Sequence, residues 1–156
     1  MESISQAFQR LPRSRKVRVI EKFVDAFLEE IGSLTVEAFK NNIDNAEDWA
    51  NAISSEWVAK KAKGGFETDI LKMTLKLRES INHRVVSSKG IKELKYTWSR
   101  KASNGKLKGT DISDFIIAAR DFTFIPKDLL QGGATYEQVW GKHMQRLRDD
   151  IIAMAK

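Results

Sequence analysis

The two histidines and the two pairs of adjacent acids are the side chains of this sequence that could do acid–base or metal chemistry. His83 and His143 lie far apart, and neither has a second ligand at a spacing that holds a metal ion. A catalytic histidine needs an orienting partner, so we expect His143, on the packed side of the last predicted helix, to be structural. Glu29–Glu30 and Asp149–Asp150 are direct neighbours, which point apart on a helix and cannot share a proton or a metal.

Other motifs of catalysis and cofactor binding are missing from the sequence. It contains no G-x-S-x-G, no H-E-x-x-H and no cysteine that could act as a nucleophile, metal ligand or disulfide partner. Gly64–Gly65 has no preceding strand and no following Lys-Ser/Thr, so it predicts a turn and not a phosphate loop. We therefore expect a protein that is not an enzyme and that uses no cofactor.

Length and composition predict a single globular domain over residues 1–156. Hydrophobic residues make up 42% of the chain, and 8 Phe and 4 Trp supply bulky core material. No segment approaches the roughly 20 apolar residues that cross a bilayer, and the N-terminus lacks the pattern of a signal peptide. We expect a protein that works in a cytoplasm without contacting a membrane.

Lysine and arginine outnumber the acids by 27 to 21, which leaves a net charge of +6. Such a mild excess favours acidic partners without identifying one. Two basic clusters are dense enough to be candidates for nucleic-acid contact, although charge runs are most often solvated faces. The clusters consist of Arg10, Arg13, Arg15, Lys16 and Arg18, and of Lys60, Lys61 and Lys63.

A long helix is predicted from Pro12 to about Asn41. Pro12 suits the first turn of a helix, where its missing N–H costs nothing. Apolar residues at three- and four-residue intervals predict one buried stripe. Either part of this long helix contacts a partner, or it is a core helix whose end is frayed or kinked near Gly32. The stripe consists of Val17, Ile20, Val24, Phe27, Leu28, Ile31 and Leu34.

The middle of the chain mixes helix and strand signals. After the polar run Asn42–Asp48, a second helix places Trp49, Ile53 and Trp57 on one face, which favours a core position over a binding surface. Thr68–Ile81 fits both a helix and a strand. Further along, the strand and turn signals are Val85–Val86, the turn Ser87–Gly90, Ile91–Trp98, the hairpin signal Asn104–Gly105, and Ile112 with Phe115–Ala119.

The clearest element is a helix at the end of the chain. Thr135 is its predicted N-cap, and Gln138 stands three residues on, at the spacing of a capping box. The order helix, helix, strands, helix predicts an α+β fold in which a long N-terminal helix and a C-terminal helix pack on a small antiparallel sheet. The apolar face of the last helix consists of Tyr136, Val139, Trp140, Met144, Leu147 and Ile151.

Two runs of the sequence match motifs of a known family. The first follows Trp57 and the Lys60–Lys61 stretch and contains Thr74, Leu77, Arg78, Ser80 and Ile81. The second comes shortly before the last helix and contains Arg120 and Phe122. Together they resemble the virion-morphogenesis and tail-completion proteins of tailed phages, in which Thr-Gly-x-Leu-Arg-x-Ser-Ile and Ile-Pro-Ala-Arg-x-Phe stand in this order. Leu75 replaces the family's Gly and Ala118 its Pro, and residues 99–110 are an insertion or a flexible hairpin.

This resemblance implies a small α+β protein at the head–tail junction or the end of the tail tube. Such proteins complete the tail by binding other virion proteins (tail tube and connector), often as a homo-oligomeric ring. An edge strand suits this role because its unpaired backbone groups can continue a neighbour's sheet. Non-specific DNA contact would fit the basic excess. The protein would then act in the host cytoplasm during assembly and afterwards in the virion.

The matched residues can be structural instead of functional. Arg78 and Arg120 could pair with carboxylates that lock the sheet to the helices, and Phe122 is expected in the core. Two other function classes stay open beside assembly. One is a basic nucleic-acid-binding regulator or DNA-packaging factor, and the other is a small enzyme, such as a nuclease, built from scattered acids.

Overall fold

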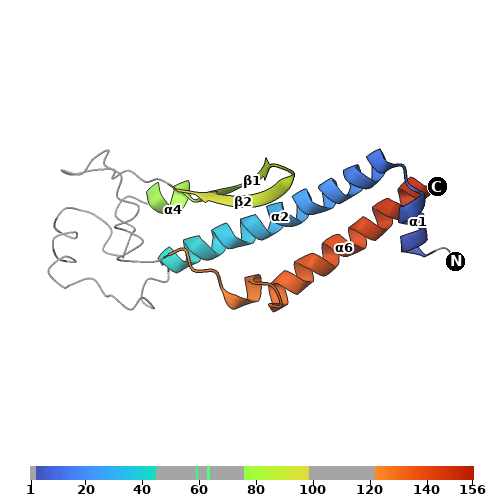
Figure 1. Ribbon diagram of the computed structural model, residues 1–156. Coiled ribbons are helices and arrows are strands. Elements are labelled where there is room, and N and C mark those ends of the chain that lie inside the picture. The colour runs from blue at the N-terminus through green and yellow to red at the C-terminus, as the bar shows by residue number, and fades with distance from the viewer. Residues whose placement is uncertain (1–2, 45–58, 60–62, 64–75, 99–121) are drawn as a thin grey trace. The chain divides into compact units, whose positions relative to one another are not determined.

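The computed structural model describes residues 3–44, 59, 63, 76–98 and 122–156 (Figure 1). The chain divides into two compact units, and each is described by itself. Unit 1 comprises Met1–Leu34, Arg84–Lys95 and Lys127–Lys156, and unit 2 comprises Thr35–His83 and Tyr96–Pro126. The single domain that the length predicts stays a prediction.

The fold is α+β, which confirms the predicted class. Two long helices, α2 (Arg13–Asp44) and α6 (Ala134–Ala155), accompany a two-stranded sheet of β1 (Asn82–Ser88) and β2 (Ile91–Thr97). The two-residue connection makes this pair an antiparallel hairpin. The shorter elements are α1 (Ile4–Arg10), α4 (Lys76–Ser80) and the 3₁₀ helix η2 (Lys127–Leu129).

Helix α1 was not predicted, although its start carries a capping box. The Ser3 hydroxyl accepts a hydrogen bond from the Gln6 backbone N–H (3.2 Å), and the Ser3 N–H donates to the Gln6 side chain (2.9 Å). Each bond satisfies an N–H group that a helix start leaves without a partner. The spacing Ser3-x-x-Gln6 was therefore the available signal, and the absence of an apolar run concealed it.

Helix α2 is longer than predicted and continues as helix through Gly32 to Asp44. The polar residues after Asn41 were expected to interrupt it, but Asn42 and Ile43 are buried. The Asn42 side-chain amide donates to the backbone carbonyls of Phe122 (2.9 Å) and Phe124 (3.0 Å). A buried amide whose donors are satisfied is compatible with a helix interior, so tertiary contacts override the polar pattern.

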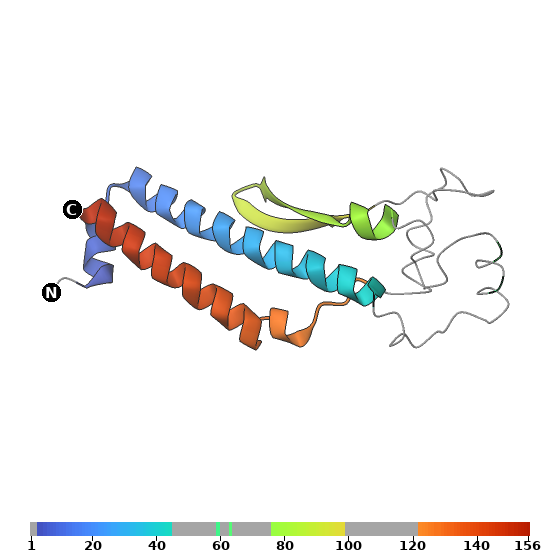
Figure 2. The same cartoon turned by 180° about the vertical axis from the view of Figure 1, so that it is seen from behind.

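Unit 1 is built on the packing of α6 against the first two thirds of α2. Figures 1 and 2 show α6 running antiparallel to this part of α2, with α1 beside the end of α6. One core cluster joins α1, α2 and the end of α6, and the other joins the middle of α2, the hairpin and the start of α6. The buried residues are Ala7, Leu11, Val19 and Ile151 in the first, and Phe27, Ile31 and Val139 in the second.

The predicted stripe of α2 is right in its middle and wrong at its start. Phe27 and Ile31 are buried as expected, but Val17 and Ile20 are 49% and 41% exposed. Val19, which the stripe omitted, is 1% exposed, because α1 and α6 contact α2 on the Val19 side. The helix is apolar on two sides at this end, and periodicity alone could not tell which side is covered.

Unit 2 has a core of its own. Val36, Phe39 and Ile43 from α2 pack with Ile81 and Phe122, and the partly buried Leu77, Tyr96 and Trp98 lie against them. Phe122 is fully buried, as predicted, and its ring lies edge-on to Trp98 with centroids 5.5 Å apart. The described part of Thr68–Ile81 is residues 76–81, which contain helix α4, so the helical alternative is correct for Lys76–Ser80.

The hairpin turns at Lys89–Gly90, and Ser87 and Ser88 belong to β1 and not to the turn. Both turn residues have positive φ angles, 50° and 78°, as a two-residue type I′ turn requires. This predicts the effect of one substitution. Gly90→Ala should destabilise the protein by about 1 kcal/mol, because alanine at positive φ is strained.

The matched control for that substitution is Gly141→Ala, in the interior of α6. A Cβ atom at either glycine would meet nothing within 4 Å, so crowding does not distinguish the two positions. Gly141→Ala should stabilise the protein by about 0.5–1 kcal/mol through helix propensity. Urea denaturation of both variants measures the difference, and equal signs would contradict the turn geometry.

Helix α6 begins differently from the prediction. Its N-cap is Gly133 and not Thr135, whose hydroxyl donates instead to the Asp128 carboxylate (2.7 Å). A Cβ atom at Gly133 would lie 2.4 Å from the Lys127 carbonyl oxygen, so only glycine fits where η2 folds against the helix start. The predicted helix over Trp49–Trp57, the hairpin at Asn104–Gly105, the strand within 112–119 and the insertion at 99–110 lie outside the described residues.

Candidate functional site

The most concentrated group of ionisable side chains in unit 1 connects α2 to α6. His143 is 3% exposed, and its Nε2 atom lies 2.7 Å from a Glu30 carboxylate oxygen. The Lys142 ammonium donates to the other oxygen of Glu30. The His143 ring also lies edge-on to Phe27, with centroids 6.2 Å apart. Glu30 therefore accepts hydrogen bonds from two successive residues of α6, at the border of the aromatic core.

These contacts shift the titration of Glu30. The hydrogen bond from Lys142 is the largest cause and lowers the pKa of Glu30 below its ordinary value of 4.5. Burial acts in the opposite direction, while the hydrogen bond with His143 and the electrostatic interactions with Lys142 and His143 add to the lowering. Glu30 therefore stays ionised to lower pH in the folded protein than in the unfolded chain.

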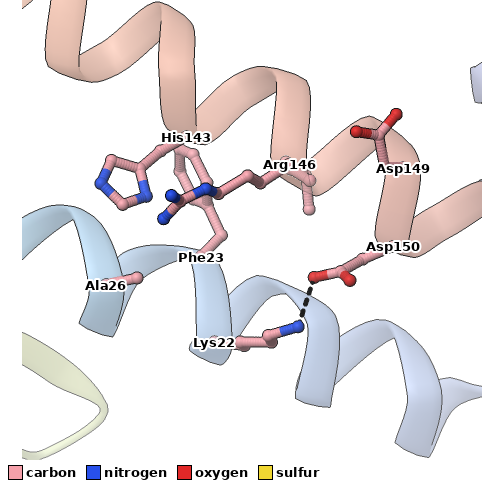
Figure 3. Close-up of a pocket in the computed structure, with 8 residues that line it drawn as sticks. Lys22, Phe23, Ala26, His143, Arg146, Asp149 and Asp150 are labelled. Atoms are coloured by element: carbon pink, nitrogen blue, oxygen red, sulfur yellow. Dashed lines mark hydrogen bonds and ion pairs between the residues drawn. The ribbon is translucent and has the colours of Figure 1, made fainter.

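Beside this group is an open depression of about 210 Å³ between α2 and α6. Figure 3 shows His143 and Arg146 projecting from α6, with Lys22 of α2 reaching Asp150. The Lys22 ammonium and the Asp150 carboxylate are 2.7 Å apart. The depression is lined by Lys22, Phe23, Ala26, His143, Arg146, Leu147, Asp149 and Asp150.

The arrangement gives His143 an orienting carboxylate, as a catalytic histidine would need. However, none of the eight residues that line the depression is a serine, threonine, tyrosine or cysteine that the imidazole could activate. Across the described residues, no three histidine and acidic side chains are grouped so that they could hold a metal ion. The contacts of His143 fit the structural role expected for it, namely fastening α6 to α2.

The two pairs of adjacent acids are separated as expected. Glu30 faces α6, whereas Glu29 is exposed. Asp150 pairs with Lys22, whereas Asp149 accepts a hydrogen bond from Gln145 on its own helix (3.1 Å). The two carboxylates of each pair point apart, so neither pair forms a two-carboxylate centre. Glu30 and Asp150, which contact the other helix, fasten α2 to α6.

The first basic cluster has a partly structural role. The Arg10 and Arg15 guanidinium groups donate to the Ala155 and Met154 carbonyls, at 3.3 and 3.0 Å. These carbonyls belong to the last turn of α6, where positive charge is favourable. The Lys16 ammonium donates to the Gln9 carbonyl (2.8 Å) and lies over the Phe8 ring. Arg13 and Arg18 are exposed, as is Lys63, while Lys60 and Lys61 lie outside the described residues.

The residues of the family motif lie mainly in and around the core of unit 2. Leu77, Ile81 and Phe122, from the two separate runs, meet in that core. Arg78 makes a bidentate contact with Asp44 at the end of α2 (2.9 Å from each of two nitrogen atoms), so it connects two helices and not a sheet to a helix. The Ser80 hydroxyl donates to the Leu77 carbonyl (2.8 Å). Thr74 and Arg120 lie outside the described residues.

A double-mutant cycle on Arg78 and Asp44 measures that bidentate contact. Both side chains are about one-third exposed (36% and 32%), so solvent weakens the pair. We expect a coupling free energy of about 0.5–1 kcal/mol from Arg78→Ala, Asp44→Ala and the double variant. The coupling should shrink in 1 M salt. A value near zero at low salt would mean that Arg78 has a different role.

Sequence reasoning missed Glu30, Asp44 and Asn42 as residues that bind other elements. Glu30 stands between Phe27 and Ile31, so its place beside a buried stripe was the available signal. Asp44 and Asn42 belong to a polar run that was expected to end the helix. No local pattern identifies their partners, because His143, Arg78 and Phe122 are distant in sequence.

No protein-family model, curated protein or solved structure matches this chain. Among the described residues, no helix has the length and apolar character needed to cross a membrane.

Proposed function

We propose that this protein is a non-catalytic assembly component that works by binding other protein subunits. The observation that carries the proposal is the exposure of large apolar side chains on several elements of unit 1. Apolar residues exposed singly are normal on a monomer, whereas neighbouring ones on one face, as Val17 and Ile20 are on α2, are typical of surfaces that bind other proteins. In unit 1 these residues are 38–62% exposed, and they are Val17, Ile20, Ile91, Leu130, Trp140 and Ile152. In unit 2, Ile125 is 37% exposed.

The ionisable groups of unit 1 support the same proposal. Lys22–Asp150, Lys92–Asp25 and Lys142–Glu30 each connect α2 to another element. Pairs of this kind align the helices and the hairpin. Binding of another subunit would then use the exposed apolar and unpaired side chains around them. A unit whose helices are aligned by ion pairs, and which exposes apolar residues, is suited to contact another subunit.

The resemblance to phage tail-completion proteins gives the narrower form of the proposal. In this form the protein joins the tail tube to the head connector, as part of a ring, and it acts in the host cytoplasm and then in the virion. Leu77, Ile81 and Phe122 support it indirectly, because two motif runs that are distant in sequence meet in one core. We expect a family of structural proteins to keep the residues that form its hydrophobic core.

The hairpin offers one way of joining subunits. Within the part of the chain that the structure describes, β1 and β2 form a sheet of two strands, so both are edge strands of that sheet. A strand of another subunit could pair with such an edge. This would suit a ring in which each subunit extends the sheet of the next.

The test is co-assembly with the products of the neighbouring genes. The expected result is a complex of defined mass with a tail-tube or connector subunit, measured by light scattering after gel filtration. Gene position is the supporting check, because the gene should lie among capsid and tail genes. A monomer that binds none of these subunits, encoded in an unrelated operon, would refute the proposal.

Nucleic-acid binding remains the alternative, and Arg13, Arg18 and Lys63 are its exposed candidates among the described residues. DNA retention at low salt should then fall when Arg13 and Arg18 become alanine. Retention that is absent at low salt would exclude this alternative, whereas strong retention without subunit binding would favour it over assembly.

A further inference from the structure

The feature that carries a further inference is the start of α2. Arg13, Val17, Ile20 and Val24 follow one another at four-, three- and four-residue spacing, so they share one side of the helix. We call these four residues the N-terminal α2 face. Val17 is 49% and Ile20 41% exposed, and Val24 is half-buried.

Further along the helix, the hairpin covers this side of α2. Leu28 and Ile31 continue the same spacing, and Leu94 of β2 packs in the cluster that contains both. Beside them, Lys92 pairs with Asp25 at 2.5 Å. Figures 1 and 2 show the first turns of α2 extending past the hairpin turn. The N-terminal α2 face is thus the exposed continuation of a surface that already accepts a β-strand carrying an apolar and a charged residue.

The charges around the N-terminal α2 face are net positive, because Arg13 and Arg18 outnumber the exposed Glu21. Arg13 and Arg18 are exposed, and within the part of the chain that the structure describes neither makes an ion pair or a side-chain hydrogen bond. The first turn of α2 contains no acidic residue, although a helix start favours negative charge. Arg15 and Lys16 already donate to backbone carbonyls, so they do not need a partner.

We propose that the N-terminal α2 face binds an acidic protein segment that carries apolar side chains and belongs to a different subunit. The apolar side chains would cover Val17 and Ile20, and the carboxylates would pair with Arg13 and Arg18. This inference rests on the proposed function, since it names the partner chemistry of one joining surface.

Charge decides between this occupant and two others. A second copy of this chain would add its own exposed Arg13 and Arg18 to the same small surface, so positive charge would accumulate there, which like-charge repulsion opposes. A nucleic acid would satisfy the arginines but would leave Val17 and Ile20 beside phosphates, where burying them gains little. An acidic, apolar segment satisfies both features at once.

The probe is a synthetic amphipathic peptide with leucines on one face and glutamates on the other, titrated into the full ¹⁵N-labelled chain. The expected result is that amide shifts concentrate on residues 13–24. The double variant Val17→Ser/Ile20→Ser should bind about tenfold more weakly, because it loses most of the apolar contact. Arg13→Gln/Arg18→Gln should also weaken binding several-fold and reduce its salt dependence.

The controls separate this surface from general stickiness. Leu130→Ser, at a residue 48% exposed elsewhere in unit 1, should leave the affinity unchanged. The same peptide with lysines in place of glutamates should not bind. All substituted side chains are exposed, so thermal denaturation should show that the variants remain folded.

Three outcomes would overturn the inference. Shifts centred elsewhere, or an affinity that Val17→Ser/Ile20→Ser does not change, would exclude this face. A DNA duplex that binds through Arg13 and Arg18 without needing Val17 or Ile20 would make it a nucleic-acid surface. Self-association abolished by Val17→Ser/Ile20→Ser would make the occupant a second copy.

The proposed function is tested separately. If Val17→Ser/Ile20→Ser still co-assembles with tail subunits at normal affinity, the assembly function stands and the docking surface is wrong. If the wild-type chain binds the acidic peptide but none of the tail subunits, the surface stands and the assembly function is wrong.

Discussion

Phe122→Ala is expected to destabilise the protein by about 3–5 kcal/mol, the largest effect of any substitution considered. The Phe122 side chain is 0% exposed and contacts Trp98 and Phe39 edge-on, with ring centroids 5.5 and 6.4 Å apart. Its removal leaves a cavity that the surrounding rings cannot fill without rearranging. Urea denaturation followed by tryptophan fluorescence and by circular dichroism gives the free energy of unfolding.

Phe124→Ala is the matched control for that experiment. It removes the same side chain two residues further on, where 53% of it is exposed. The backbone carbonyls of both residues accept hydrogen bonds from Asn42, and alanine keeps those carbonyls. We expect less than about 1 kcal/mol for Phe124→Ala. Similar losses for the two variants would show that Phe122 does not form the centre of the unit 2 core.

Glu30→Gln is expected to cost about 1–2 kcal/mol at pH 7, the second largest effect. The substitution leaves His143, which is 3% exposed, and Lys142 without their common carboxylate. The Glu30 side chain is 30% exposed, so solvent screens the interaction and keeps the cost below that of a fully buried pair. Thermal or urea denaturation at several pH values measures it.

The pH dependence of this effect has a definite sign. Because the pKa of Glu30 is lowered on folding from 4.5, its ionised form stabilises the folded state. This stabilisation is fully present above the unfolded value of 4.5 and is lost as the pH falls through the lower folded value. The part of the difference between wild type and Glu30→Gln that comes from the Glu30 charge should therefore shrink as the pH falls below 4.5.

Glu21→Gln, on the exposed part of the same helix, is the control for Glu30→Gln. It removes an equal charge and should change stability by less than about 0.5 kcal/mol at any of these pH values. A pH profile for Glu30→Gln that runs parallel to that of Glu21→Gln would contradict the contact with α6.

Much of the fold could be predicted because its signals are local. Phe27 and Ile31 repeat at helical spacing and are buried, and the alternating run Ile91–Trp98 contains β2 (Ile91–Thr97). His143, which the sequence places on or near the packed side of the last predicted helix, is buried. In each case one segment contains the whole pattern.

The predictions were wrong where a segment contained two competing apolar faces, or an N-cap signal that the folded chain does not use. Val17 and Val19 are both apolar, and only the packing of α1 and α6 determines that Val19 is buried and Val17 exposed. Thr135 has the residue type and spacing of an N-cap, but η2 approaches so closely that Gly133 takes that position. The choice in each case depends on residues that are distant in sequence or on a local backbone contact that composition does not show.

The sequence by itself determined that the fold is α+β, that its long helices are amphipathic, and that adjacent acids could not form a catalytic pair. Only the tertiary structure decided what the charged and polar residues do. Glu30 binds His143 and Lys142, Asp44 binds Arg78, and Arg15 binds the end of α6. The physical reason is that hydrophobic periodicity acts within one element, whereas an ion pair or a helix-end contact requires two elements already placed side by side.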